Sequence, residues 1–555
     1  MLDDLGWADV GFHGSNFPTP AMDELVNGGL ELKRLYVNPT CSPTRSAALT
    51  GRHPFNMGMQ HWTTTFPGST AALPLDVPTL AEELKAKAGY RTEMVGKWHL
   101  GAAKESNLPH RRGFDNFYGI LQGATDLYER TLGFCINEAF GVANGTCLPW
   151  ATASGKSPLE SELDDNVFYD FWENSRPVWE DKGTYVMDSY IERVERIIDQ
   201  AGSTESNPTA EPLFLYFAEQ AVHAPLQAPP QPEHLQACVD AGVTGSSSAG
   251  NRDMSNRTVL CSMANKVDHS IGRLVEALKK NGMWDNTLVW VLTDNGGMVD
   301  WGGELLGWYA TTSSSNWPLR GMKTTLFDGG VRAVSFMTGG YLPQSARGQT
   351  SSELLHAVDI TPTLLALAGV SEADSPPMDG LDAWGAVTTG GTTGRDEIPI
   401  NIDVGSKFGD AIEDFPANML IPMLVPNWAP NPRLGVRGGA NFSALISWPY
   451  KIIVGLPSNA IPADKWGWWS IENYSMVKGP PAREHPRAPV RLYNLEADEG
   501  EHNDLSAALP EVVERLMQRV AFYANPDNGF RRPQNNIPRL RANPMKQNWT
   551  IGPFL

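Results

Sequence analysis

The alternation of apolar and amphipathic segments predicts an α/β fold for the longer, N-terminal part of this chain. Short apolar runs of strand length occupy residues 212–218 and 288–292, and a further strand is expected at 91–95. Segments with helical periodicity lie between them, at 79–89 and 262–280. Such alternation is typical of a large mixed, mostly parallel sheet flanked by helices. Polar residues follow each strand, and open α/β sheets bind ligands at that edge.

The C-terminal part has a different pattern. A Gly/Thr-rich stretch at 385–396 marks a boundary, followed by a strand expected at 444–454 and an amphipathic helix expected at 510–524. We therefore predict two domains, an α/β domain over 1–390 and a smaller α+β domain over 391–555. The smaller domain is expected to hold an antiparallel sheet, a helix and an extended tail.

Length and charge narrow the possible functions. The 555 residues exceed what one hydrophobic core normally supports, which agrees with two domains. The net charge of -19 opposes binding to nucleic acid or to anionic membranes, and no apolar run is long enough to span a membrane. An anionic ligand would have to be attracted by a local group of cations. The turn-rich stretches 149–182 and 242–250 are expected to be surface insertions.

One short motif carries the most chemical information. Cys41-Ser-Pro-Thr-Arg45 has the pattern C-x-P-x-R and leads into a helix-like run that ends at Arg52. A thiol before a helix N-terminus and near a guanidinium lies in surroundings that favour anions. A lone cysteine is more often a small buried apolar residue. The full string resembles the sulfatase family, in which this cysteine is oxidised to formylglycine and the hydrated aldehyde attacks a sulfate ester. The resemblance also implies a formylglycine-generating enzyme as a partner.

Two acidic pairs are candidate metal ligands. Asp3-Asp4 and Asp294-Asn295 each follow an apolar strand, and their hard oxygen atoms suit Ca²⁺ or Mg²⁺. Either pair alone is more often a turn or a helix cap. The sulfatase resemblance implies that all four residues bind one divalent cation, usually Ca²⁺ with Mg²⁺ as the alternative, and that modified Cys41 also reaches it.

Four further residues complete the predicted catalytic set. Lys97 and His99 stand two positions apart at a strand end and share one side if the backbone stays extended; alone, such a pair is often a solvated lysine beside a packed histidine. The resemblance implies that Lys97 and Lys323 bind the sulfate and that His99 contacts the formylglycine hydroxyls and acts as a base. It also implies that His223 protonates the leaving alcohol and that Arg45 holds the hydrated aldehyde.

Other strings indicate the branch of the family. The segments 111–115, 316–321, 492–496 and 552–555 are similar to the arylsulfatase B branch, which includes N-acetylgalactosamine 4-sulfatase. This implies a sulfated carbohydrate, such as a glycosaminoglycan, or a small aryl sulfate as substrate. Two alternatives stay open: a phosphate or phosphonate ester hydrolase of the same superfamily, and an inactive homologue that binds sulfated glycans.

The cysteines and sequons suggest a secretory route. If Cys41 is reserved for modification, the other four cysteines can form two disulfides, and sequence neighbours suggest Cys135 with Cys147 and Cys238 with Cys261; other pairings remain open. N-glycosylation sequons occur at Asn144, Asn256, Asn441, Asn473 and Asn548. We expect a lysosomal or extracellular protein. Related families begin with an apolar strand that ends at the Asp pair, so that strand and a targeting segment are expected upstream of Met1.

Overall fold

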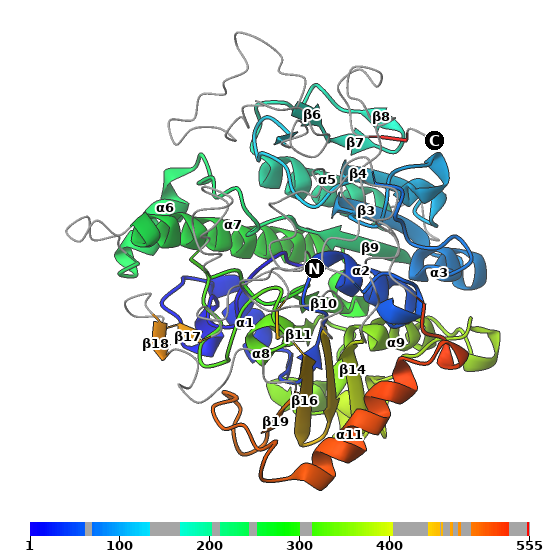
Figure 1. Ribbon diagram of the computed structural model, residues 1–555. Coiled ribbons are helices and arrows are strands. Elements are labelled where there is room, and N and C mark those ends of the chain that lie inside the picture. Colours follow the sequence, from blue (N-terminus) through cyan, green and yellow to red (C-terminus); the bar gives the residue numbers. More distant parts are fainter. Residues whose placement is uncertain are drawn as a thin grey trace, which may run out of the picture.

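The computed structural model describes most of the chain. The described residues are 1–60, 69–133, 167–202, 211–243, 252–299, 313–402, 442–455, 457–458, 467–469, 476–478, 490–531 and 552–553. Figure 1 shows two main sheets flanked by helices, with a further sheet and the helix α11 at one end.

The first main sheet has five strands in the order β8-β7-β4-β3-β9. Its strands are β3 (Arg91–Lys97), β4 (Asn116–Ile120), β7 (Trp172–Glu173), β8 (Arg176–Pro177) and β9 (Leu213–Ala218). β3 runs parallel to β4 and to β9, whereas β7 and β8 are antiparallel additions at the edge. The strands predicted at 91–95 and 212–218 are confirmed, and the mixed sheet agrees with the predicted fold class.

The second main sheet has the order β10-β11-β1-β12. Its strands are β1 (Leu30–Leu32), β10 (Val289–Leu292), β11 (Ser335–Thr338) and β12 (Gln349–Ser351). The first residues of the chain lie between this sheet and the first one. The amide of Leu2 donates to the Leu292 carbonyl (2.8 Å), and the amino group of Met1 donates to the Phe217 carbonyl (2.7 Å). Asp3 and Asp4 therefore emerge where the two sheets meet.

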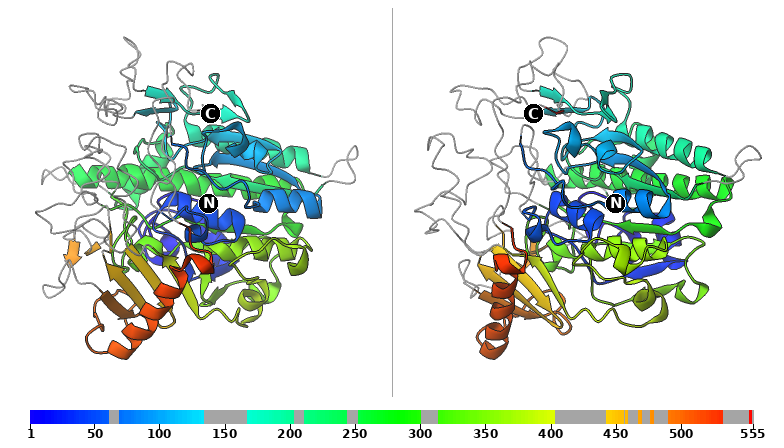
Figure 2. Two further views of the ribbon diagram at one scale, coloured as in Figure 1. Left: turned by 45° about the vertical axis from the view of Figure 1, so that its right-hand side comes forward. Right: turned by 90° about the vertical axis from the view of Figure 1, so that its right-hand side faces the viewer.

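Alternating side chains of β3 face two different helix layers. Val95 packs in the same cluster as Val194 and Ile198 of α5, whereas Met94 packs in the cluster of Ala81 from α3. Because neighbouring side chains of a strand point to opposite faces, both faces of this sheet are covered. The helices are α1 (Pro20–Asn27), α2 (Cys41–Thr50), α3 (Leu80–Ala88), α5 (Val186–Ala201), α6 (Pro232–Asp240), α7 (Arg252–Lys280) and α9 (Ile360–Leu367). In Figure 2, α5 and α7 lie in one layer.

Two predictions about this region need correction. The helix predicted at 262–280 begins earlier, at Arg252, where apolar periodicity is weak and the start of the helix is joined to α6 through Cys261. The stretch predicted as an insertion at 149–182 contributes β7 and β8, and Tyr169, Phe171 and Trp172 of this stretch are buried. Phe171 packs edge-on against Tyr118 with ring centroids 4.9 Å apart. Residues 149–166 and 244–250 lie outside the described residues.

The C-terminal sheet is antiparallel, in the order β14-β15-β16-β19. It comprises β14 (Glu397–Asn401), β15 (Phe442–Ser447), β16 (Tyr450–Gly455) and β19 (Val490–Asn494), with α11 (Pro510–Tyr523) beside it. The single strand predicted at 444–454 is wrong, since the residues form a hairpin with Trp448-Pro449 at its turn. Proline cannot donate to a ladder and so interrupts the strand. The predicted helix is confirmed, while the domain division at 390 stays a prediction.

The antiparallel sheet packs on both faces. Ala444 and Ile446 pack in one cluster with Phe327 and Val331, and Leu445 packs in another with Leu516 and Val520 of α11. Because neighbouring side chains of a strand point to opposite faces, one face of this sheet packs against the rest of the molecule and the other packs against α11. The remaining elements are short: β2 (Leu35–Tyr36), β5 (Thr131–Gly133), β6 (Val167–Tyr169), β13 (Leu355–His356), β17 (Trp468–Trp469), β18 (Met476–Lys478), α8 (Asp328–Val331) and α10 (Trp384–Thr389).

One predicted disulfide is confirmed. Cys238 and Cys261 are bonded, with an S–S distance of 2.04 Å, whereas Cys135 and Cys147 lie outside the described residues. Of the five sequons, Asn256 lies on α7 and the other four lie outside the described residues, so glycosylation stays a prediction. Among the helices that the structure describes, none combines the length and apolar character that crossing a membrane requires.

Candidate active site

Cys41 is the first residue of α2, and the whole of this helix is buried. Its sulfur lies 3.5 Å from Asp3 Oδ1 and donates to it. Burial, and then the nearby Asp294 carboxylate, raise the pKa of the Cys41 thiol to about 12. The unmodified side chain is therefore a protonated thiol at neutral pH and a poor nucleophile.

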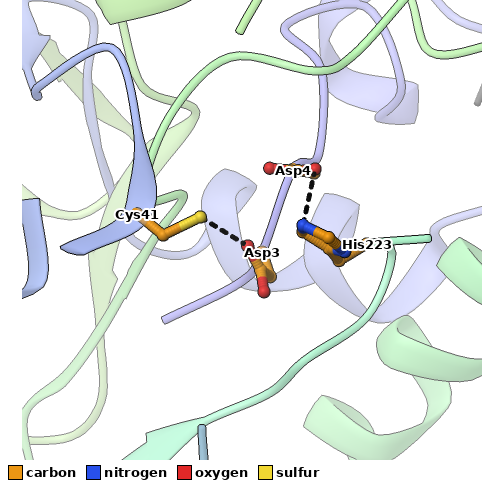
Figure 3. A group of neighbouring side chains, drawn as sticks. All are labelled: Asp3, Asp4, Cys41 and His223. Atoms are coloured by element: carbon orange, nitrogen blue, oxygen red, sulfur yellow. Dashed lines mark hydrogen bonds and ion pairs between the residues drawn. The ribbon is translucent and has the colours of Figure 1, made fainter. Parts of the chain in front are cut away.

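Carboxylates and a histidine surround this cysteine. Ligand atoms of Asp3, Asp4, Cys41 and His223 all lie within 4.8 Å of one another. Figure 3 shows these four side chains and the contacts of Cys41 with Asp3 and of His223 with Asp4. The aspartates come from the segment after Leu2, the cysteine from α2 and the histidine from the loop after β9. Residues far apart in the sequence thus meet where the two main sheets come together.

Each aspartate of the site is paired with a cation. Lys97 Nζ lies 2.5 Å from Asp3 Oδ2, and Lys323 Nζ lies 2.7 Å from Asp4 Oδ1. Burial alone would raise the pKa of both carboxyls, but Lys97 acting on Asp3 and Lys323 acting on Asp4 hold them below the usual range. Both carboxylates therefore stay ionised although they are buried.

Arg45 ties the third aspartate to the cysteine helix. Its Nε and Nη2 donate to Asp294 Oδ2 over 3.0 and 2.8 Å, and its Nη1 donates to the Lys97 carbonyl over 2.9 Å. A planar guanidinium can make these bonds together, whereas an ammonium cannot. Arg45 thus fixes α2 against the ends of β3 and β10.

Asn295 supplies a buried oxygen that suits a metal ion. Its Nδ2 donates to Asp4 Oδ1 (2.7 Å) and to the Gly296 carbonyl (2.9 Å). Its Oδ1 is buried and has no hydrogen-bond partner among the described residues. A buried acceptor without a donor calls for an explanation, and hard cations such as Ca²⁺ bind amide and carboxylate oxygens. The residues present therefore fit a divalent cation held by Asp3, Asp4, Asp294 and Asn295.

Both predicted histidines lie at this site; His99 is buried and His223 is partly buried. His223 Nε2 is 3.6 Å from Asp4 Oδ2, and its Nδ1 is 2.6 Å from the Ala224 carbonyl. Burial, assisted by Lys323, lowers the pKa of His223; burial, assisted by Lys97, places the pKa of His99 well below its usual value. His99 and Asp4 also have positive φ angles, 55° and 60°. Strained backbone of this kind in non-glycine residues is concentrated at functional sites.

The structure brings all ten predicted residues together, and it also reveals supporting residues that the sequence did not indicate. Asp170 accepts hydrogen bonds from the amides of Leu121 (3.0 Å) and Gln122 (2.8 Å). The Leu121 carbonyl in turn accepts from the His99 amide (3.1 Å). Asp170 lies in the stretch that looked like an insertion, and no motif distinguished it there.

The fold and this site define a hydrolase of anionic esters, and comparison with known proteins identifies its family. Residues 1–370 match the family model described as Sulfatase. The chain belongs to the sulfatase family and is a sulfuric ester hydrolase. The predicted family and enzyme class are thereby confirmed.

Curated relatives agree with this assignment. Mouse arylsulfatase J is 32% identical over 564 residues, which cover 100% of this chain and 79% of the relative. Bovine arylsulfatase A is 32% identical over 390 residues, covering 69% of this chain and 65% of the relative. Human N-acetylgalactosamine-6-sulfatase is 29% identical over 395 residues, covering 69% of this chain and 63% of the relative. The alignments with the latter two thus span less than two thirds of those proteins.

Solved structures confirm the fold class. Ps i-CgsB in complex with k-i-k-neocarrahexaose matches with a TM-score of 0.66 and 24% identity, covering 99% of this chain and 95% of that one. The phosphonate monoester hydrolase of Agrobacterium radiobacter matches with a TM-score of 0.55 and 16% identity, covering 95% and 94%. At these identities the similarity shows the fold alone.

Proposed function

We propose that this enzyme removes sulfate from a sulfated carbohydrate or an aryl sulfate. The nucleophile is formylglycine formed from Cys41, and the site holds a divalent cation, with Ca²⁺ favoured over Mg²⁺. One observation carries the proposal: the buried Cys41 sulfur lies beside Asp3, within a cluster of oxygen ligands and two lysines. A buried thiol with a raised pKa is poorly suited to attack by itself.

Conversion of Cys41 to an aldehyde would supply, after hydration, an oxygen nucleophile at the start of α2. Arg45 would keep this residue oriented, because it fixes α2 through the three hydrogen bonds to Asp294 and Lys97 described above. The modification requires the formylglycine-generating enzyme as a partner during biosynthesis.

Asp3, Asp4, Asp294 and Asn295 would hold the cation, as the partnerless Asn295 Oδ1 and the clustered carboxylates suggest. When bound, a divalent cation supplies Lewis acidity and neutralises negative charge. Modified Cys41 would lie next to it, because its sulfur is in hydrogen-bond range of Asp3.

Lys97 and Lys323 would bind the sulfate group. Each ammonium has three donors, and each pairs with one carboxylate of the site, so it can also donate to a sulfate oxygen. Their charges would stabilise the negative charge of the transition state in a buried site where electrostatic interactions are strong.

The two histidines would move protons. His223 lies beside Asp4 at the mouth of the cluster and would protonate the leaving alcohol. His99, which is neutral because burial lowers its pKa, would accept a proton from the hydrated residue 41 and allow sulfate to leave. These assignments match the roles that the sequence motifs implied.

The substrate and the compartment belong to the same proposal. The names of the relatives include an N-acetylgalactosamine-6-sulfatase, which favours a sulfated carbohydrate such as a glycosaminoglycan. The Cys238–Cys261 disulfide favours an oxidising compartment, and so a secretory route to the lysosome or the extracellular space.

The test compares 4-nitrophenyl sulfate with 4-nitrophenyl phosphate, using protein made together with a formylglycine-generating enzyme. The proposal predicts a higher kcat/KM for the sulfate and loss of activity in Cys41→Ala. It also predicts that a chelator abolishes the activity and that added Ca²⁺ restores it. A higher kcat/KM for the phosphate would favour the phosphate or phosphonate ester hydrolase. Binding of a sulfated glycan by modified protein without any turnover would favour the inactive binding homologue.

A further inference from the structure

Three chain segments supply the proposed cation and sulfate ligands, and one side chain joins them. The geometry points to Asn316 as a positioning residue that holds the segments of Asp3 and Asp4, of Asp294 and Asn295, and of Lys323 in register. This inference rests on the proposed cation site. Among the described residues, the side chain of Asn316 forms its hydrogen bonds with backbone groups of Trp7, Gly297 and Gly321, so its effect would be exerted through the backbone.

Asn316 is buried and uses both ends of its amide. Its Oδ1 accepts from the amides of Gly297 (2.9 Å) and Trp7 (3.4 Å). Its Nδ2 donates to the carbonyls of Gly297 (2.9 Å) and Gly321 (3.2 Å). The two donors and two acceptor sites of a side-chain amide are thus all used, on three different segments.

Gly297 is the centre of this arrangement. Besides its two bonds with Asn316, its carbonyl accepts from the backbone amide of Lys323 (3.1 Å). Gly297 stands two residues after Asn295, so the amide of Asn316 and the lysine that would bind sulfate are attached to the same short metal-ligand loop.

Asn316 is itself held firmly against the first segment. Asp9 accepts from the amides of Gly6 (3.2 Å) and Ser315 (3.1 Å), and the Ala8 amide donates to the Ser315 carbonyl (2.9 Å). Arg257 Nη1 lies 2.8 Å from Asp9 Oδ1 and balances its charge. The backbone next to Asn316 is therefore fixed to the segment that begins with Asp3 and Asp4.

Two glycines allow the three segments to approach this closely. A Cβ atom at Gly297 would lie 1.8 Å from Ser314 Oγ, and one at Gly6 would lie 2.3 Å from the Ser315 carbonyl oxygen. The segments lie so close together that a displacement of one of them, caused by a change at Asn316, would also displace the ligand positions on the others.

The test measures Ca²⁺ binding, because a role in stability alone would leave it unchanged. Wild type and Asn316→Ala are titrated with Ca²⁺ by calorimetry as proteins with an unmodified Cys41, and kcat and KM for 4-nitrophenyl sulfate are measured on modified protein. We expect Asn316→Ala to weaken Ca²⁺ binding by about 10- to 100-fold, as for other residues that orient metal ligands, and to lower kcat.

Asn401→Ala is the matched control. Asn401 is also buried, and its Nδ2 donates to the Phe442 carbonyl (2.6 Å) in the C-terminal sheet, outside the catalytic cluster. We expect this variant to lose thermal stability while its Ca²⁺ affinity stays within about twofold of wild type, since the hydrogen bond of the Asn401 side chain goes to β15 and not to a segment of the proposed ligands.

The outcomes separate the two proposals. Wild-type Ca²⁺ affinity in folded Asn316→Ala would overturn the role of Asn316. Failure of the wild type itself to bind Ca²⁺ would overturn the cation site instead. If Asn316→Ala does not fold, Asn316→Ser, which keeps one donor and an acceptor, is measured in its place; an unchanged affinity there would equally overturn the inference.

Discussion

The aspartates of the active site are buried charges held by individual cations. Lys97 pairs with Asp3, Lys323 with Asp4 and Arg45 with Asp294. Removing one member of a buried pair leaves an uncompensated charge and is strongly destabilising. Each cation can therefore matter both for stability and for catalysis, and variants must separate the two effects.

Lys323→Ala tests the predicted role of a cation in sulfate binding. We expect kcat for 4-nitrophenyl sulfate to fall by about 10²- to 10³-fold, the usual effect of losing one stabilising contact to a transition state. Circular dichroism and a thermal melt in saturating Ca²⁺ check that the variant is folded. Lys182→Ala, which removes a partly exposed partner of Glu129, is the control. Near wild-type kinetics would exclude Lys323 from the site.

Arg45→Lys tests the forked geometry rather than the charge. Lysine keeps the charge but loses bonds to Asp294 and the Lys97 carbonyl, so we expect unfolding in urea to show a loss of about 1–3 kcal/mol. The control is Arg273→Lys, because Arg273 makes a similar fork with Glu195 (2.8 and 2.6 Å) in a partly exposed position. For Arg273→Lys we expect a loss of about 1 kcal/mol or less in the free energy of unfolding. An equal loss at both positions would contradict the role assigned to Arg45.

At the scale of single elements, local signals allowed some helices and strands to be predicted from the sequence. The helix α3 is an example, since Thr79 accepts from the Glu82 amide and Glu82 accepts from the Thr79 amide, with Gly89 in a left-handed conformation at the other end. The signals for its start and end lie within one helix length. The capping box and the C-terminal glycine therefore make the bounds of this helix predictable from local sequence, although packing of Leu80 and Leu84 against the rest of the molecule also stabilises it.

Thr79→Ala should therefore destabilise the protein measurably. We expect a loss of about 0.5–2 kcal/mol in the free energy of unfolding, the usual range for a lost N-cap, measured by chemical denaturation. Thr350→Ala, at an exposed position whose hydroxyl donates to Glu31, should change it by less than about 0.5 kcal/mol. Equal stability of both variants would show that the cap does not contribute as its geometry suggests.

Elements that depend on distant contacts could not be predicted in this way. β7 and β8 are two residues each and exist because Trp172 and Glu173 pair with the edge of β4. Candidate catalytic residues could be named from the sequence because short motifs at strand ends single them out, and their roles stay predictions. Asp170 and the joining role of Asn316 were not, since their hydrogen bonds reach segments far away in the sequence.

At the scale of the whole molecule, buried ionisable groups make stability depend on pH. Burial raises the pKa of Asp170 and of Glu501 to about 7. Their contribution to stability is complete below the unfolded pKa, near 4, and is lost as the pH rises through about 7. Burial lowers the pKa of His53 to about 3, so its contribution is complete above about 6.5 and is lost as the pH falls toward 3.

We therefore expect stability to be greatest at mildly acidic pH and to fall as the pH rises from about 5 to about 7. Urea denaturation at a series of pH values measures this. Asp170→Asn should flatten the decline between about pH 5 and 7, because an amide cannot ionise and can still accept a hydrogen bond from Leu121 or Gln122. An unchanged slope in this variant would contradict the contribution assigned to Asp170.

The central claim, that formylglycine at position 41 is the nucleophile, is tested most directly by mass spectrometry of the tryptic peptide 35–45 from active enzyme. The account predicts that turnover rises in proportion to the fraction of this peptide in which the thiol of Cys41 has been replaced by an aldehyde. Full sulfatase turnover by a preparation in which the peptide retains its thiol would contradict it.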